Sequence, residues 1–186
     1  METTHQPHDE PAEAEEPQEK VWTWQRRELA SATAEKYRGT RHVNRLNLPG
    51  EGVDCINFVM AVLAGAGVIP KIRLPFYDER LGSFRQRNVI QDIFEIHGFV
   101  DARDPTKSPE FGDVVICQCG RQSNHVGIIL DGWFWHVPAG GFCSPEEWAV
   151  WKYRAQALLR FTKTGLRNDP RKLRWDDIKR LADKPI

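Results

Sequence analysis

The chain has 186 residues, 40% of them hydrophobic and 28% charged. This length and composition suit one domain with a buried core, and they exclude a fibrous repeat or a wholly disordered protein. The longest nearly uncharged apolar run, residues 55–70, is shorter than the roughly 20 residues of a bilayer-spanning helix. We therefore expect no insertion into a membrane.

The formal net charge of zero hides an uneven distribution. Residues 1–20 contain seven acidic residues and a single lysine, without the apolar stretch of a secretory signal. We predict a disordered acidic leader over residues 1–20, a folded domain over residues 21–165 and a basic extension over residues 166–186. From Trp151 onward the chain has eleven basic and four acidic residues, a surplus that favours an anionic polymer but is also typical of a solvated face. We expect synthesis in the cytoplasm and no nucleic-acid partner.

Helices are predicted at three places in the first half of the chain. A loosely helical spacing of apolar residues predicts the first over residues 23–36. Asp54 is a favourable N-cap for the apolar run 55–67, which Gly67 can terminate. Because that run is apolar nearly all round, we expect a central, buried helix. A shorter helix is predicted over residues 88–96.

The second half of the chain predicts a sheet. A β-branched run predicts a strand over residues 113–119. Asp131-Gly132 stands between two apolar runs, the pattern of a two-residue type I′ hairpin. Residues 144–147, Ser-Pro-Glu-Glu, have the form of a capping box, so we expect a helix to begin there. Alternation predicts a closing strand over residues 155–161, and a short helix is predicted over residues 175–182.

The predicted hairpin brings two histidines to one face. With Asp131-Gly132 as the turn, Gly127 pairs with His136, and His125 lies diagonal to His136 at about 7 to 8 Å between backbones. We expect Gly127 to leave room between the two rings. Such a pair suits a catalytic relay or a metal site, although a single histidine on a strand is more often structural. The opposite face is wholly apolar and is expected to face the core: Val126, Ile128, Leu130, Trp133, Trp135 and Val137.

Cys55 directly follows the predicted N-cap Asp54. Unpaired backbone N–H groups and the helix dipole at this position favour thiolate over thiol, and a neighbouring imidazolium does so further. A cysteine in an apolar run is also commonly an inert core residue. Because Gly50 and Gly52 place Cys55 just after a sharp turn that a substrate can approach, we interpret it as a candidate nucleophile.

The sequence resembles the NlpC family of papain-like cysteine peptidases over roughly residues 30–162. The resemblance rests on Gly39-Thr40, GVDCINFV over residues 52–59, FGDVVIC over residues 111–117, HVGIIL from His125, and a second histidine after the hairpin. It implies an α+β, papain-like fold in which the cysteine helix packs on a central antiparallel sheet, and it makes residues 21–165 the catalytic domain. It also implies that Cys55 is the nucleophile, His125 the general base and His136 the orienting third member, with no cofactor and no metal.

The same resemblance implies a substrate. Enzymes of this family commonly cut peptide stems of peptidoglycan, often between D-γ-glutamyl and diaminopimelyl residues. Ile56 and Asn57 stand where the family usually has Ser-Gly, and His42 stands near a position often filled by Tyr. We expect His42 and Asp54 to contact substrate, with capping as the other role of Asp54. The lack of a signal suits a phage-type tail or lysis enzyme, or a delivered effector, with a phage tail or immunity protein as partner.

Three other interpretations remain compatible with these residues. The two histidines with Cys117, Cys119 and Cys143 supply enough ligands for zinc, although Cys-x-Cys on a strand is not the spacing of a zinc knuckle. Alternation packs Cys117 and Cys119 beside Val115, and nothing in the sequence explains Cys143. A thioester on the same three residues can also pass to an amine or lipid, which would make an acyltransferase. The last alternative is a non-enzymatic structural or binding protein that retains the fold.

Overall fold

The computed structural model describes residues 21–71, 74, 89–104, 106–119 and 122–165. The predicted leader over residues 1–20, the basic extension over residues 166–186 and the helix over residues 175–182 lie outside the described residues. The domain boundaries therefore stay a prediction.

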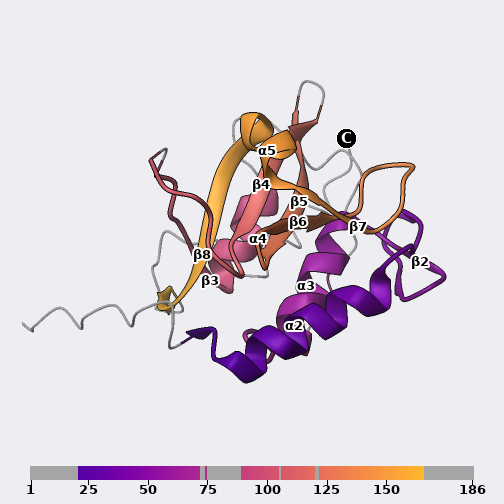
Figure 1. The fold of residues 1–186 in the computed structure, drawn as a ribbon, viewed down its shortest axis with the longest axis horizontal. Coiled ribbons are helices and arrows are strands. Elements are labelled where there is room, and N and C mark those ends of the chain that lie inside the picture. The colour runs from indigo at the N-terminus through magenta and orange to yellow at the C-terminus, as the bar shows by residue number, and fades with distance from the viewer. Residues whose placement is uncertain (1–20, 72–73, 75–88, 105, 120–121, 166–186) are drawn as a thin grey trace, which may run out of the picture.

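The described part is an α+β domain (Figure 1). Its helices and strands follow in this order: α2 (Trp24–Tyr37), β1 (Asn47–Leu48), β2 (Gly52–Val53), α3 (Cys55–Gly65), α4 (Val89–Ile96), β3 (Gly98–Asp101), β4 (Val114–Cys119), β5 (Gln122–Leu130), β6 (Trp133–His136), β7 (Ser144–Glu147), α5 (Trp148–Trp151), the 3-10 helix η2 (Lys152–Arg154) and β8 (Ala155–Gly165).

Six of the strands form one antiparallel sheet in the order β3-β8-β4-β5-β6-β7. Strands β1 and β2 form a separate two-stranded sheet just before α3. Strand β8, predicted from the alternation in residues 155–161, lies inside the large sheet between β3 and β4. The predicted fold class, a cysteine helix packed on a central antiparallel sheet, is confirmed.

The three predicted helices of the first half are present with nearly the predicted bounds. Thr23 caps α2, where its hydroxyl accepts a hydrogen bond from the backbone N–H of Arg26. Asp54 caps α3, and its carboxylate accepts from the backbone N–H of Asn57 at 2.8 Å. Gly67 follows α3 with φ +68°, the left-handed conformation that ends many helices.

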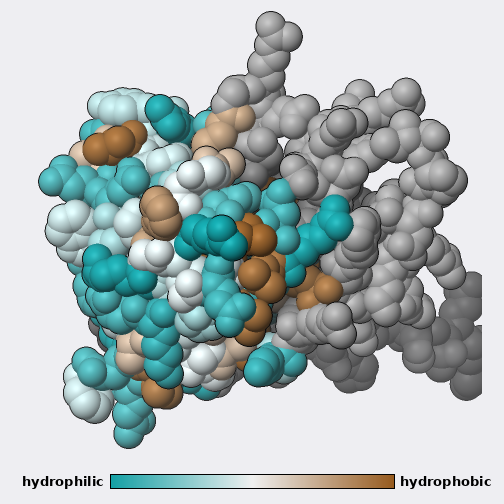
Figure 2. Space-filling view, turned by 90° about the vertical axis from the view of Figure 1, so that its right-hand side faces the viewer, coloured by the Kyte–Doolittle hydropathy of each residue, from teal (hydrophilic) through white to brown (hydrophobic). Residues whose placement is uncertain are grey.

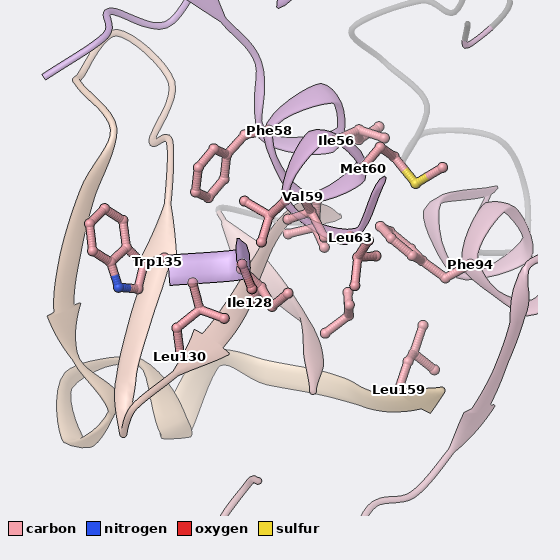
Figure 3. Close-up of a cluster of buried hydrophobic side chains, with 14 of the residues drawn as sticks. Ile56, Phe58, Val59, Met60, Leu63, Phe94, Ile128, Leu130, Trp135 and Leu159 are labelled. Carbon is pink, nitrogen blue, oxygen red and sulfur yellow. The ribbon is translucent and has the colours of Figure 1, made fainter. Parts of the chain in front are cut away.

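The main core lies between α3 and one face of the sheet (Figure 3). Helix α3 is buried on most of its circumference, as its apolar composition predicts. Figure 3 shows its side chains directed at residues from β5, β6, β8 and α4. Burial of each large apolar side chain stabilises the fold by about 1.5–3 kcal/mol, so this cluster holds the cysteine helix in place. The residues labelled there are Ile56, Phe58, Val59, Met60, Leu63, Phe94, Ile128, Leu130, Trp135 and Leu159.

A second, smaller cluster lies on the opposite face of the sheet, beneath α5. It consists of Val115, Cys117, Ile129, Phe134 and Trp151. The predicted core face of the hairpin is confirmed with one exception. Trp133 is 46% exposed, so the prediction for this residue is wrong. Alternation decides which face a side chain takes, but it does not decide how far the covering layer extends.

The prediction that a helix begins at residues 144–147 is wrong. These residues form strand β7, which pairs with β6, and the helix begins only at Trp148. The free edge of β6 offers backbone hydrogen bonds to any extended segment beside it. Pro145 is compatible with this position because β7 lies at the edge of the sheet, where an N–H is not required on both sides.

The surface is mainly hydrophilic on the face that Figure 2 shows, with a few apolar side chains among the polar ones. None of the helices in the described parts of the chain is both long and apolar enough to cross a bilayer. The large apolar side chains that are exposed lie on several separate elements: Trp24, Leu29, Leu48, Trp133, Phe142, Val150 and Tyr153.

Candidate active site

Cys55 is the first residue of α3, and its side chain is partly accessible. Asp54, directly before it, is buried and holds the chain in position. One carboxylate oxygen accepts hydrogen bonds from the backbone N–H of Arg45 at 2.6 Å and from the side-chain amide of Asn57 at 2.9 Å. The second oxygen caps the helix. The start of α3 is thus tied to the preceding loop, which fixes where the thiol lies.

Three backbone N–H groups lie near enough to the Cys55 sulfur to lower the pKa of its thiol. Two belong to Cys55 and Ile56, and the third belongs to Val126 on β5. Since Val126 directly follows His125, this contact joins the cysteine helix to the histidine strand. Seventy positions along the chain separate Cys55 from His125.

The environment of Cys55 favours the thiol over the thiolate. Burial raises the pKa of Cys55 to about 12, and the negative charge of Asp54 acts in the same direction. The three backbone N–H groups lower this pKa, but by less. The prediction that the helix N-terminus would favour the thiolate is therefore wrong for the resting structure, because removal of the sulfur from water outweighs the helix terminus.

The predicted hairpin is present with the predicted register. Asp131 and Gly132 both have positive φ, 49° and 82°, as a type I′ turn requires. Gly127 pairs with His136. His125 and His136 consequently lie on one face of the sheet, and Nε2 of His125 is 2.8 Å from Nδ1 of His136.

Both histidine rings are held in a dry environment. His125 is 5% exposed and His136 is fully buried. Burial lowers the pKa of His125 to about 3, and the neighbouring His136 and His42 contribute in the same direction. Burial also lowers the pKa of His136, although the charge and contact of Glu146 oppose this. Both rings are therefore neutral at physiological pH.

Gly127 does not make room for the two rings in the way expected from the sequence. A Cβ at this position would lie 2.4 Å from the Phe134 ring and 2.6 Å from the backbone oxygen of Trp135. The space beside Gly127 is thus filled by Phe134, which stacks on His136 with ring centroids 4.9 Å apart. Gly127 is required because Phe134 packs against the backbone here.

Two residues that the sequence did not single out complete the surroundings of His136. Glu146 on β7 places Oε1 3.2 Å from Nε2 of His136, a close polar contact that is not aligned as a hydrogen bond. The other oxygen, Oε2, accepts a hydrogen bond from Nε1 of Trp151 at 2.6 Å. The sequence did not point to Glu146, because residues 144–147 have the pattern of a capping box. That pattern predicts a helix start unless the adjacent sheet edge is known.

His42 lies at the rim of the site. Its backbone forms a bridge with Val53, two residues before Cys55, and its N–H donates to the oxygen of Gly141 at 2.8 Å. Its side chain is half-buried, and it is near enough to His125 to lower the pKa of that residue. The structure therefore brings His42, Cys55, His125 and His136 to one region.

The other three cysteines are packed within the fold. Cys117 belongs to the cluster beneath α5, and Cys119 packs against that cluster. Cys143 is buried in the main core, where its backbone exchanges hydrogen bonds with Gly39 and Thr40. All four cysteines are free thiols. In the described parts of the chain, no three His, Cys, Asp or Glu side chains converge in a way that could hold a metal ion.

No protein-family model matches the sequence, and no curated protein matches it. Solved structures do. NlpC1 from Trichomonas vaginalis aligns with a TM-score of 0.52 at 15% identity, over 77% of this chain and 46% of that one. A Staphylococcus aureus subsp. aureus Mu50 protein of the NLP/P60 family, described as similar to lipoprotein, aligns with a TM-score of 0.50 at 18% identity, over 75% of this chain and 42% of that one. The NlpC/p60 domain of the peptidoglycan hydrolase SagA aligns with a TM-score of 0.46 at 18% identity, over 73% of this chain and 98% of that one.

The chain spans less than half the length of the first two of these proteins. The aligned part of each includes about three quarters of this chain. Together with the cysteine helix on an antiparallel sheet, these likenesses show that the chain has the NlpC/p60 fold.

Proposed function

We propose that the protein is a cysteine peptidase that hydrolyses amide bonds in the peptide stems of peptidoglycan. Cys55 is the nucleophile, His125 the general base and His136 the residue that orients it. The NlpC/p60 fold supports the substrate class, since the similar structures include a domain of a peptidoglycan hydrolase. The arrangement of the three side chains supports the reaction.

One observation carries the proposal. The backbone N–H of Val126, the neighbour of His125 in β5, lies near enough to the Cys55 sulfur to lower the pKa of the thiol. At the same time Nε2 of His125 is engaged by His136 at 2.8 Å. We assign Nδ1, the other ring nitrogen of His125, to the thiol. Nucleophilic catalysis requires a nucleophile, a base and a third group that orients the base.

The reaction proceeds in two stages. Nδ1 of His125 takes the proton of the Cys55 thiol while the sulfur bonds to the carbonyl carbon of the substrate amide. The imidazolium then gives this proton to the leaving amine as the C–N bond breaks, and a thioester remains on Cys55. In the second stage, water loses a proton to His125 and attacks the thioester, which releases the acid and restores the thiol.

The oxyanion formed in each stage needs hydrogen-bond donors. We assign this role to the backbone N–H of Cys55, at the N-terminus of α3, since a preorganised donor of this kind contributes several kcal/mol. Because burial keeps Cys55 as a thiol at rest, attack and proton transfer must occur together once the substrate is bound.

Two further residues lie beside the nucleophile. His42 is placed to contact the substrate at the rim. Both carboxylate oxygens of Asp54 accept hydrogen bonds from the chain itself, so we assign Asp54 mainly to positioning α3. Contact between Asp54 and the substrate stays a prediction from the sequence. The exact bond cleaved also stays a prediction, as does release by a phage or delivery as an effector.

Replacement of the nucleophile tests this function. Purified peptidoglycan is incubated with the wild-type protein and with Cys55→Ala, and the released fragments are quantified by mass spectrometry. We expect the variant to lose at least about 10³-fold in rate, as removal of a catalytic nucleophile does, while its melting temperature changes little. Cys119→Ala is the matched control and should retain hydrolysis, since Cys119 is a free thiol at the end of β4 to which the proposed mechanism gives no role.

Two outcomes contradict the proposal. Retained hydrolysis by Cys55→Ala would reject the role of Cys55, and no hydrolysis by the wild-type protein would reject the reaction. Products that carry an added amine in place of water would instead identify an acyltransferase.

A further inference from the structure

A carboxylate lies beside the histidine pair, next to His136. Glu146 lies on β7, opposite Phe134 of β6. Its Oε1 is 3.2 Å from Nε2 of His136, which is fully buried. His125, His136 and Glu146 therefore form a row with His136 in the middle. The proposed function places Cys55 beside His125, at the end of the row away from Glu146.

The row has two possible proton arrangements when both rings are neutral. In the first, His136 carries its proton on Nε2, facing Glu146, and its Nδ1 accepts from Nε2–H of His125. Nδ1 of His125 is then a free acceptor. In the second, His136 carries its proton on Nδ1 and donates it to Nε2 of His125, which leaves His125 with its proton on Nδ1. Only the first arrangement leaves a base facing the thiol.

A carboxylate distinguishes the two arrangements because an ionised carboxylate can only accept hydrogen bonds. In the first arrangement a proton of His136 faces Oε1 of Glu146, and the contact is attractive. In the second, a ring lone pair faces a negatively charged oxygen, and the contact is repulsive. Glu146 thus favours the arrangement in which His125 can act as a base.

Trp151 holds the carboxylate in place. Its indole Nε1–H, which can only donate, gives a hydrogen bond of 2.6 Å to Oε2 of Glu146. Its ring packs against His136 and His125, with centroids 4.4 and 5.4 Å away. One side chain therefore fixes the carboxylate and encloses both rings.

The neighbouring charges keep Glu146 ionised. Burial opposes ionisation, but the hydrogen bond from Trp151, the contact with His136 and the charge of Arg154 outweigh it, so the pKa of Glu146 lies below its usual range. Arg154 also lies over the Trp151 ring, 5.1 Å from the ring centroid, in a cation–π contact. At the other end of the row, the charge of His42 lowers the pKa of His125.

We infer that Glu146, held by Trp151, is a positioning residue that imposes the Nε2–H form on both histidines and so leaves Nδ1 of His125 free to take the proton of Cys55. The catalytic part of this inference rests on the proposed function. The part that concerns the histidine protons does not.

The decisive variant is Glu146→Gln. A glutamine amide presents one oxygen and one NH₂ group. Trp151 requires the oxygen, so the NH₂ group must face His136, and this reverses the proton arrangement along the row. We expect the rate of peptidoglycan hydrolysis to fall about 10- to 100-fold, as loss of an orienting partner of a functional histidine does.

Removal of the indole donor should restore part of this loss. In Glu146→Gln combined with Trp151→Phe, the amide is free to turn its oxygen toward His136. We expect the double variant to be more active than Glu146→Gln alone, whereas independent structural damage at the two positions would make it less active. Glu147→Gln is the matched control, since Glu147 is the exposed neighbour on the same strand and should leave the rate unchanged.

The proton positions can be measured directly by ¹⁵N NMR of the histidine rings, without any substrate. We expect protons on Nε2 of His125 and His136 in the wild-type protein, and on Nδ1 of both in Glu146→Gln. Wild-type protein with His125 protonated on Nδ1 would overturn the inference, as would a variant with unchanged protons. Because the wild-type measurement needs no substitution, the inference stays testable if the variant fails to fold. If the wild-type protein does not hydrolyse peptidoglycan, the proposed function fails, and the NMR result still decides the role of Glu146.

Discussion

Cys55 and His125 are both uncharged at rest. The pKa of Cys55 is raised to about 12, and the pKa of His125 is lowered to about 3. In both cases burial is the largest cause, because the charged form of each group loses contact with water. Between these two pKa values Cys55 is a thiol and His125 is a neutral imidazole, so the resting state is not a thiolate and an imidazolium.

This state can be tested by thiolate absorbance near 240 nm, measured as the difference between wild-type protein and Cys55→Ala. A raised pKa means that the sulfur keeps its proton to higher pH, so we expect no Cys55 thiolate between pH 5 and 9. The subtraction removes the signals of Cys117, Cys119 and Cys143. A thiolate signal that is already complete at pH 7 would show a preformed ion pair.

At the scale of single elements, the hairpin of β5 and β6 carries the site. Its two-residue turn sets the register, and the register places both histidines on one face. Phe134, on the same face, packs over Gly127 and stacks on His136. The position of the His136 ring therefore depends on the absence of a side chain at Gly127.

Gly127→Ala should disturb this packing. The added methyl would overlap both the Phe134 ring and the backbone at Trp135, so we expect a loss of about 3 kcal/mol in the free energy of unfolding and slower hydrolysis. Gly67→Ala is the control, because it adds strain from a positive φ without any overlap. It should cost about 1 kcal/mol and leave hydrolysis unchanged. Thermal melting and peptidoglycan assays of both variants measure this difference, and equal effects would contradict it.

At the scale of the whole molecule, a buried ion pair ties the strand β8 to the start of β4. Asp113 is fully buried, and both of its oxygens accept from the guanidinium of Arg160, at 2.9 and 2.8 Å. Arg160 also contacts Glu110 at 2.7 Å. Burial raises the pKa of Asp113 even though these hydrogen bonds act to lower it, so this carboxylate depends on its partner to remain ionised.

Removal of the partner should be costly. We expect Arg160→Ala to lower the free energy of unfolding by about 3 kcal/mol, since it leaves the buried carboxyl group of Asp113 without its guanidinium partner. Arg103→Ala, which breaks an exposed ion pair with Asp101, should cost less than about 1 kcal/mol. Urea denaturation of the two variants gives both values. A loss for Arg160→Ala as small as that for Arg103→Ala would show that the pair contributes little.

Much of the local structure could be predicted from the sequence. The cap at Asp54, the helix behind Cys55, the turn at Asp131-Gly132 and the register that aligns His125 with His136 all follow from interactions within a few positions of the chain. These features decide where the candidate nucleophile lies on its helix and which face of the hairpin carries the two imidazoles.

Only the tertiary structure decided the rest. Residues 144–147 carry local signals for a helix start, but the free edge of β6 makes them a strand and thereby brings Glu146 to His136. The helix N-terminus favours a thiolate at Cys55, but burial between distant segments reverses this preference. Both outcomes depend on which remote parts of the chain pack together, because pairing at a sheet edge and removal from water are properties of the assembled fold.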